Sequence, residues 1–298
     1  MNNPRSIRIH YLLRAAILLA LALYIGHLVQ QDALHYYVAP KLARWIRLCP
    51  VPLVLMALSL GLQAVLGRSA ALCDCEHRLP RSGLGSSVLY SLFLLPLLLG
   101  VLLPDRALGS AAAARKGLAL SYTAVESRTG TSTNSGSTFT PANPYEAEFA
   151  ELAGKLYAEP VIPVRPEIYS ETLGAMNLYK SQFAGKEISV SGFLYREPQG
   201  AGQSAYAVSR FLVQCCTADA TPFGILLEPG TPISLPADTW IEVRGKLDVA
   251  VYKGAETLMI APESITAVQA PTTPYVYTNA DAVAAWEELK EQPPGALR

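Results

Sequence analysis

The chain has 298 residues, of which 51% are hydrophobic and 16% are charged, a balance that indicates a membrane protein. Its net charge is zero, yet residues 1–142 hold 13 basic and 5 acidic side chains and residues 143–298 hold 11 basic and 19 acidic ones. The acidic second part would repel phosphate backbones, so we expect no nucleic-acid partner.

Three apolar stretches predict transmembrane helices, because each is close to the ~20 residues that cross a bilayer. They are residues 11–29, 49–66 and 86–104. The first is interpreted as a retained anchor, since no small-residue cleavage site follows it and two more stretches do. Residues 1–120 are therefore a predicted transmembrane domain in contact with the lipid bilayer. His27 and Gln63 are polar exceptions, and such side chains face other helices, a pathway or the membrane interface.

The orientation of these helices follows from their first residues. Lys and Arg are equally numerous at the four boundaries of the stretches, so the positive-inside rule does not distinguish the two sides. A basic N-terminus followed directly by an apolar stretch favours an N-terminus inside the cell. Three spans then place the C-terminal domain outside. The expected location is the cell membrane, with an extracytoplasmic C-terminal domain.

Metal-ligand side chains gather in the loop between the second and third stretches. Cys73, Cys75 and His77 lie there with two carboxylates, and these groups suit zinc or another transition metal. Their spacing matches no standard structural zinc motif, so a solvated polar loop is the alternative interpretation.

The second half begins with a polar linker. Residues 121–142 are rich in Ser, Thr and Gly and predict a flexible tether to a soluble domain over residues 143–298. Asn143, which is followed by proline, predicts the start of a helix. A second helix is expected over residues 168–183, with Gly185 at its end.

From Lys186 onward the apolar residues alternate, which predicts five strands separated by turns. Gly192 and Gly245 would permit the bend or bulge that closes a small barrel. The predicted fold is a five-stranded barrel of the oligonucleotide/oligosaccharide-binding (OB) type with flanking helices, and a β-sandwich is the alternative. The barrel fold does not by itself imply the usual OB ligands.

The most distinctive element of the barrel is residues 210–219, which end in two adjacent thiols and a carboxylate. In a regular strand Cys215 and Cys216 would point to opposite faces, one to the core and one to solvent. With a turn or bulge at Cys216, both thiols and Asp219 could bind zinc or another thiophilic metal, or the thiols could form a disulfide. The alternative is that the thiols only brace the fold. No other cofactor is expected.

Other residues near this element have structural and functional interpretations. Arg210 could pair with Asp219 or Glu242 and hold the strands together. Trp240 is expected to be a core aromatic residue. Tyr275 and Tyr277 could form a docking surface for a partner or pack the C-terminal tail on the barrel.

Six segments of the chain resemble the bacterial YcgQ-type family. They are Tyr37-Val-Ala-Pro-Lys-Leu, Arg115-Lys-Gly, Gly192-Phe-Leu-Tyr-Arg196, Arg210-Phe-Leu-Val-Gln-Cys-Cys-Thr-Ala-Asp219, Trp240-Ile-Glu-Val-Arg-Gly245 and Pro274-Tyr-Val-Tyr277. The resemblance implies a subunit of a two-component membrane permease complex whose partner is a larger polytopic permease encoded nearby. Some members carry a His-rich insertion between the second and third spans, which this chain lacks.

These features together predict an accessory subunit that is anchored by three helices and docks its barrel on a permease. All four histidines lie in the first 77 residues, so the second half has no Ser-His or Cys-His pair, and we expect no enzymatic activity. The alternative function is a membrane-anchored metal or thiol-redox sensor that uses Cys215, Cys216 and Asp219.

Overall fold

The computed structural model describes residues 4–66, 83–120, 139–197 and 205–291. The chain forms two compact units, Met1–Arg106 and Ala107–Arg298. Cys73, Cys75 and His77 lie outside the described residues, as does most of the predicted linker.

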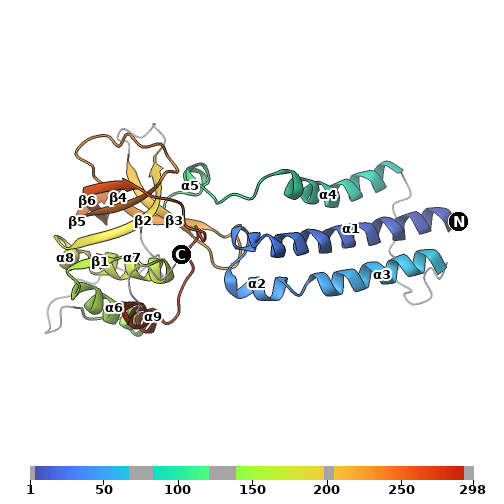
Figure 1. The fold of residues 1–298 in the computed structure, drawn as a ribbon. Helices are drawn as coiled ribbons and strands as arrows, with labels where there is room; N and C mark the ends of the chain where they lie inside the picture. The colour runs from blue at the N-terminus through green and yellow to red at the C-terminus, as the bar shows by residue number, and fades with distance from the viewer. Residues whose placement is uncertain (1–3, 67–82, 121–138, 198–204, 292–298) are drawn as a thin grey trace. The chain divides into compact units, whose positions relative to one another are not determined.

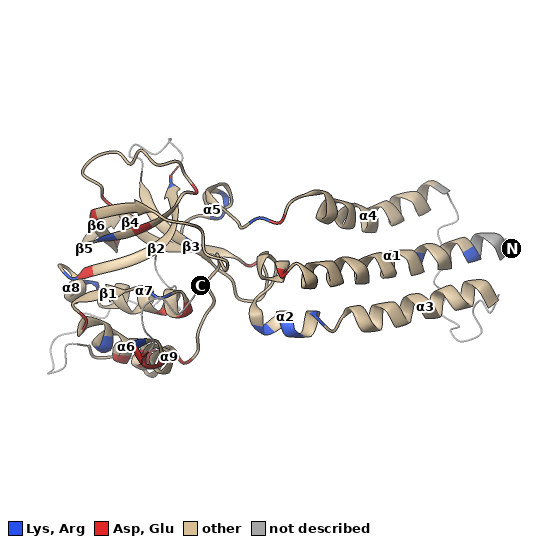
Figure 2. Ribbon diagram, viewed as in Figure 1, with Lys and Arg blue, Asp and Glu red and all other residues tan. Residues whose placement is uncertain are grey.

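The first unit consists of three long apolar helices and short connecting elements (Figure 1). They are α1 (Pro4–Gln30), α3 (Pro50–Leu66) and α4 (Gly83–Leu102), with a 3-10 turn (Ala33–Tyr36) and α2 (Pro40–Ile46) between α1 and α3. All three predicted spans are confirmed as helices long and apolar enough to cross a membrane. Figure 2 shows no charged residue in α3 or α4, whereas basic residues mark α2.

Small side chains lie where the helices of the first unit approach one another, and a polar pair lies within α3. Ala22 of α1 and Ala57 of α3 are buried, as expected where helix backbones approach closely. A side chain at Gly100 of α4 would collide with the Tyr24 hydroxyl of α1. Gln63 donates a hydrogen bond to the Ser59 hydroxyl one turn earlier, at 3.2 Å.

The second unit contains a closed five-stranded mixed barrel, which confirms the predicted barrel and its flanking helices. Its strands are β2 (Glu187–Arg196), β3 (Tyr206–Leu212), β4 (Thr221–Leu227), β5 (Trp240–Tyr252) and β6 (Ala255–Ala267). The hydrogen-bonded order is β2-β3-β4-β6-β5, and β5 pairs back to β2. Only β4 and β6 are parallel within the barrel. Because one sheet closes on itself, the β-sandwich alternative is wrong.

The glycines singled out in the sequence lie where the barrel bends. The register of β5 against β6 shifts between Arg244 and Gly245, as expected for a bulge. Gly192 packs against the backbone carbonyl of Ser209 on β3, so no side chain fits there. Gly185 has a φ of +85° and follows the second predicted helix.

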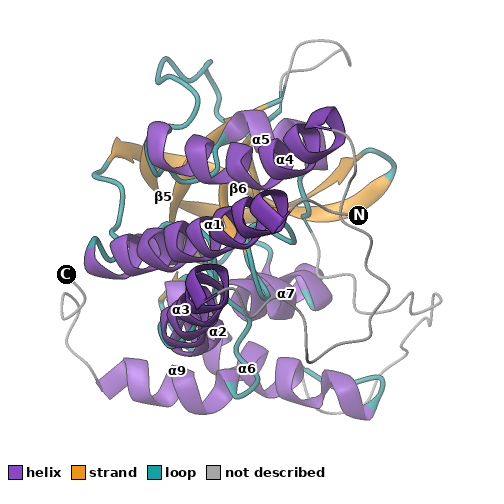
Figure 3. Ribbon diagram, turned by 90° about the vertical axis from the view of Figure 1, so that its right-hand side faces the viewer, coloured by secondary structure: helices purple, strands orange, loops and turns teal. Residues whose placement is uncertain are grey.

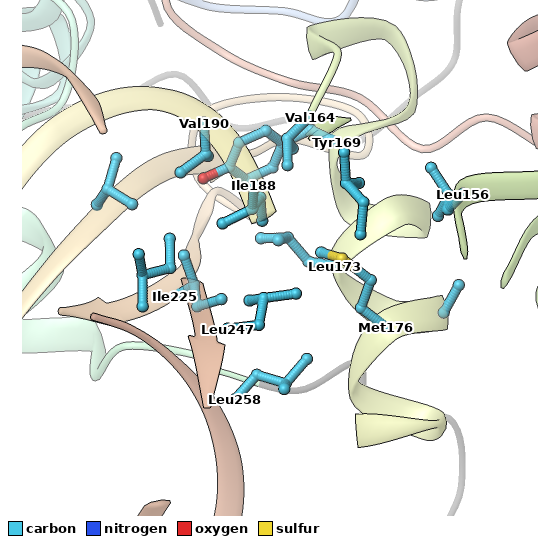
Figure 4. Packing of buried hydrophobic residues seen from close by; sticks show 14 of the residues in the cluster. Leu156, Val164, Tyr169, Leu173, Met176, Ile188, Val190, Ile225, Leu247 and Leu258 are labelled. Atoms are coloured by element: carbon cyan, nitrogen blue, oxygen red, sulfur yellow. The ribbon is translucent and has the colours of Figure 1, made fainter. Parts of the chain in front are cut away.

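Helices close one side of the barrel in two layers (Figures 1 and 3). They are α7 (Tyr169–Leu178) against the strands, α6 (Ala147–Tyr157) and α9 (Ala282–Glu291) beyond it, and the short α8 (Lys180–Phe183), with 3-10 turns at Pro144–Glu146 and Pro166–Ile168. Leu173 and Met176 of α7 face Ile188 and Leu247 of the strands (Figure 4). Sequence patterns did not predict α9 or β1 (Val161–Pro163), which pairs in parallel with β2.

We predict that Gly192→Ala lowers the free energy of unfolding by about 1–3 kcal/mol, because its methyl group must displace the β3 backbone. Gly230→Ala is the matched control, since nothing lies within 4 Å of that position. It should change stability by less than about 0.5 kcal/mol. Chemical denaturation of the purified chain in detergent, followed by tryptophan fluorescence, measures both. Equal stability of the two variants would contradict the close approach.

Candidate functional site

The vicinal thiols lie in a loop and not in a strand. Strand β3 ends at Leu212, and Cys215 and Cys216 follow after two residues. The expectation that one thiol faces the core is therefore wrong, because Cys215 is exposed and Cys216 is half-buried. Their Sγ atoms do not form a disulfide, and the Cys215 thiol donates a hydrogen bond to the Cys216 sulfur at 3.7 Å. A tight turn after Cys216, closed by a hydrogen bond from Asp219 N–H to the Cys216 carbonyl at 3.0 Å, brings Asp219 back beside them.

The carboxylate of Asp219 holds this loop together through three backbone hydrogen bonds. Gln214 N–H donates to Oδ1 at 2.9 Å, and the N–H groups of Cys215 and Cys216 donate to Oδ2 at 2.8 and 3.2 Å. A charged acceptor makes such bonds roughly twice as strong as neutral ones. We name residues 213–220 the thiol loop, and its shape depends on Asp219.

The hydrogen bonds of the thiol loop also set the protonation states of the Cys215 thiol and the Asp219 carboxylate. Hydrogen bonding to Asp219, and secondly to Cys216, raises the pKa of the Cys215 thiol to about 11. Partial burial favours the protonated form of Asp219, but hydrogen bonds from the Cys215 thiol and the three N–H groups outweigh it and lower the Asp219 pKa to about 2. At neutral pH the loop therefore holds a carboxylate and a protonated Cys215 thiol.

Arg210 lies inside the molecule and pairs with neither predicted acid. It donates to the Ser191 carbonyl at 2.9 Å and to the Ser191 hydroxyl at 2.8 Å. Its guanidinium also lies over the rings of Trp240 and Tyr169, 5.0 and 5.8 Å from their centroids. Burial lowers the pKa of Arg210. The contact between Arg210 and Trp240 indicates that both residues stabilise the barrel.

Tyr275 and Tyr277 pack against the barrel, and we name residues 274–277 the tail. Tyr275 is buried, with its ring 6.4 Å from that of Phe211, and its hydroxyl accepts the Leu108 N–H at 3.0 Å. Burial raises the pKa of the half-buried Tyr277 to about 12. Val276 between them pairs with Leu212, at the end of β3 that β2 does not reach. The tail therefore completes the barrel in the structure of this chain.

Residues 107–120 bind the outer side of the barrel, which sequence patterns did not predict. They include α5 (Ser110–Lys116), whose Ala113 is completely buried. Ser110 N–H donates to the Asp238 carboxylate, and Ala119 bridges to Phe223 at the start of β4. We name residues 107–120 the barrel strap. Contacts thus assign it to the second unit, although it precedes the predicted linker.

One sequence signal does indicate that a second layer covers the barrel strands. Strands β3 and β4 are buried at nearly every position, on both faces, and not at alternate positions. Continuous burial requires a layer on each side of a sheet, and apolar runs such as residues 223–227 are its mark in the sequence. The helices account for one layer, and the strap with the tail supplies the other.

The strap also reaches the thiol loop. The Lys116 ammonium donates to the carbonyl of Ala218 at 3.1 Å and to that of Ala220 at 2.6 Å. These two carbonyls flank Asp219, so the end of α5 and the Asp219 carboxylate fix the same turn. Among the described residues, Cys215, Cys216 and Asp219 form a cluster that could hold a metal ion.

We predict that Asp219→Asn makes the Cys215 thiol more reactive. Removing the charged acceptor lowers the thiol pKa towards its ordinary value, so the thiolate fraction at pH 8 rises about tenfold or more. The alkylation rate with iodoacetamide, measured in a chain whose other four cysteines are serine, reports this fraction. Asp248→Asn, an exposed carboxylate on β5, should leave the rate unchanged. A rate insensitive to Asp219→Asn would show that Asp219 does not control the thiol.

Comparison with known proteins connects this geometry to a family. The DUF1980 N-terminal domain matches residues 13–119, and the DUF1980 C-terminal domain matches residues 139–278. UPF0703 protein YcgQ of Bacillus subtilis is 24% identical over 197 residues, which cover 64% of this chain and 68% of that protein. A Streptococcus mutans protein named "Putative two-component membrane permease complex subunit" is 25% identical over 196 residues, covering 61% of this chain and 70% of its own length. No solved structure matches the chain significantly.

Proposed function

Because this chain belongs to the DUF1980 family, we propose that it is an accessory, non-enzymatic subunit of a membrane permease complex. The observation that carries the proposal is the direct connection of an apolar helix to a barrel-bound segment. Residues 103–107 alone separate the end of α4 from Leu108 of the strap. The name of the Streptococcus mutans relative supports the permease assignment.

In this proposal the apolar helices anchor the subunit in the membrane and contact the permease there. Among the described side chains, only Ala22 and Leu28 of α1 and Ala57 and Ala64 of α3 are buried within the chain, and none of α4 is. Such surfaces are covered by lipid or by helices of another protein. The proposed partner is a larger polytopic permease encoded nearby, whose helices pack beside α1, α3 and α4.

The barrel is the region of the proposed subunit that lies outside the bilayer. In OB-type barrels the ligand surface lies over the second and third strands, which correspond here to β3 and β4. In this chain the strap and tail cover those strands. The barrel, proposed to be of the OB type, therefore uses this surface to hold its own chain and not an oligonucleotide. Residues 103–107 connect α4 covalently to the strap of the barrel that is proposed to dock on the permease.

We predict that the full chain co-purifies with the permease from mild detergent when both are expressed together. Ala113→Asp should reduce the recovered complex severalfold, because it places a charge at a completely buried position and releases the strap. Ala111→Asp, in the same helix but exposed, is the matched control. Failure of the unaltered chain to co-purify would contradict the permease role. Equal recovery of both variants would contradict the role of the strap.

The proposed extracytoplasmic position of the barrel has its own test. Ala255→Cys places a thiol on the exposed start of β6, in a chain whose five native cysteines are serine. A membrane-impermeant maleimide should label it in intact cells, because the reagent reaches only groups outside the membrane. Labelling only after lysis would place the barrel in the cytoplasm.

A further inference from the structure

We propose that Cys215, Cys216 and Asp219 form a binding site for a soft divalent cation with the size and geometry of zinc. Their ligand atoms, two thiol sulfurs and a carboxylate oxygen, all lie within 4.8 Å of one another. Thiolates and carboxylates are established zinc ligands. The inference concerns the thiol loop alone and does not depend on the permease role.

The distance between the sulfurs fits a tetrahedral cation. With zinc–sulfur bonds of about 2.3 Å, two thiolates on a tetrahedral ion lie about 3.8 Å apart. The Sγ atoms of Cys215 and Cys216 are separated by 3.7 Å. A disulfide would require about 2.05 Å. The hydrogen bond from the Cys215 thiol to the Cys216 sulfur therefore already holds the two sulfurs at the separation that a tetrahedral ion requires.

Hydrogen bonds within the chain shape the loop. Three N–H groups orient the Asp219 carboxylate, and Lys116 fixes the carbonyls on either side of it. Oδ1 accepts one of the three backbone hydrogen bonds, and the hydrogen bond from the Cys215 thiol to Asp219 is released when that thiol loses its proton, so the carboxylate has a lone pair for a cation. Since the ligands are already positioned, binding costs little additional ordering.

Two consequences follow for the chemistry of binding. Each thiol loses its proton to solvent as its sulfur bonds to the cation, so one bound divalent cation releases two protons and leaves two thiolates on the ion. Three protein ligands leave the fourth tetrahedral position to water or to a group from another molecule. Cys215 is exposed, which gives the ion access from solvent.

Cobalt(II) titration tests the site in the full-length chain in detergent, with Cys49, Cys73 and Cys75 replaced by serine. A phosphine reductant keeps the two remaining thiols reduced. We expect a sulfur-to-cobalt charge-transfer absorption that saturates at about one ion per chain and is displaced by zinc. Cys215→Ser and Cys216→Ser should each abolish or strongly weaken it. Asp219→Asn should weaken cobalt binding by about tenfold or more.

Controls separate loss of ligands from loss of fold. Glu228→Gln changes an exposed carboxylate just after β4 and should leave cobalt binding unchanged, while melting temperature reports whether each variant remains folded. Absence of the charge-transfer band would overturn the proposal, as would a band that folded Cys215→Ser and Cys216→Ser variants retain. A chain that takes up no cobalt after reduction, but forms a Cys215–Cys216 disulfide with a mild oxidant, would identify a redox pair instead.

Discussion

The pairing of β2 with both β3 and β5 is the constraint on which the second unit depends. It closes the sheet, so that the barrel has an inside, where strand side chains pack together and against α7, and an outside that must be covered separately. Closure also removes the exposed strand edges that promote aggregation. Where β2 and β3 approach closely, Gly192 lies against the backbone carbonyl of Ser209, which leaves no room for a side chain.

Closure leaves short stretches of strand without a neighbour, and segments distant in sequence fill them. The strap supplies Ala119 to the start of β4, and the tail supplies Val276 to the end of β3. The Tyr275 hydroxyl then joins tail and strap through Leu108. Backbone polar groups that would otherwise lack partners are thereby satisfied. Segments that precede and follow the strands in sequence thus complete the barrel, and the preceding one, the strap, comes directly after α4.

The thiol loop shows how one carboxylate organises a small site. Asp219 binds three backbone N–H groups, raises the pKa of Cys215 and lies within metal-binding reach of both sulfurs. The sequence marked these residues because two thiols and an acid within five positions are unusual. It could not show that β3 stops at Leu212, and this decides whether the sulfurs diverge or converge.

Arg210 does not pair with either of the acids that the sequence suggests for it. Asp219 and Glu242 are the acids expected beside it, yet the guanidinium lies between two aromatic rings and bonds to Ser191. Aromatic faces and uncharged oxygens satisfy a cation as an acid would, and no sequence pattern announces them. Asp219 was already engaged by its own loop.

The sequence by itself determined the three apolar helices, the alternating strands and the glycines at which the barrel bends. Hydrophobic length, periodicity and backbone permissiveness are local properties, so they can be read from neighbouring residues. Only the tertiary structure decided that residues 107–120 and 275–277 cover the outer face of the barrel and that Cys215, Cys216 and Asp219 converge. These arrangements depend on which surfaces remain uncovered after the barrel closes, and that is a property of the whole fold.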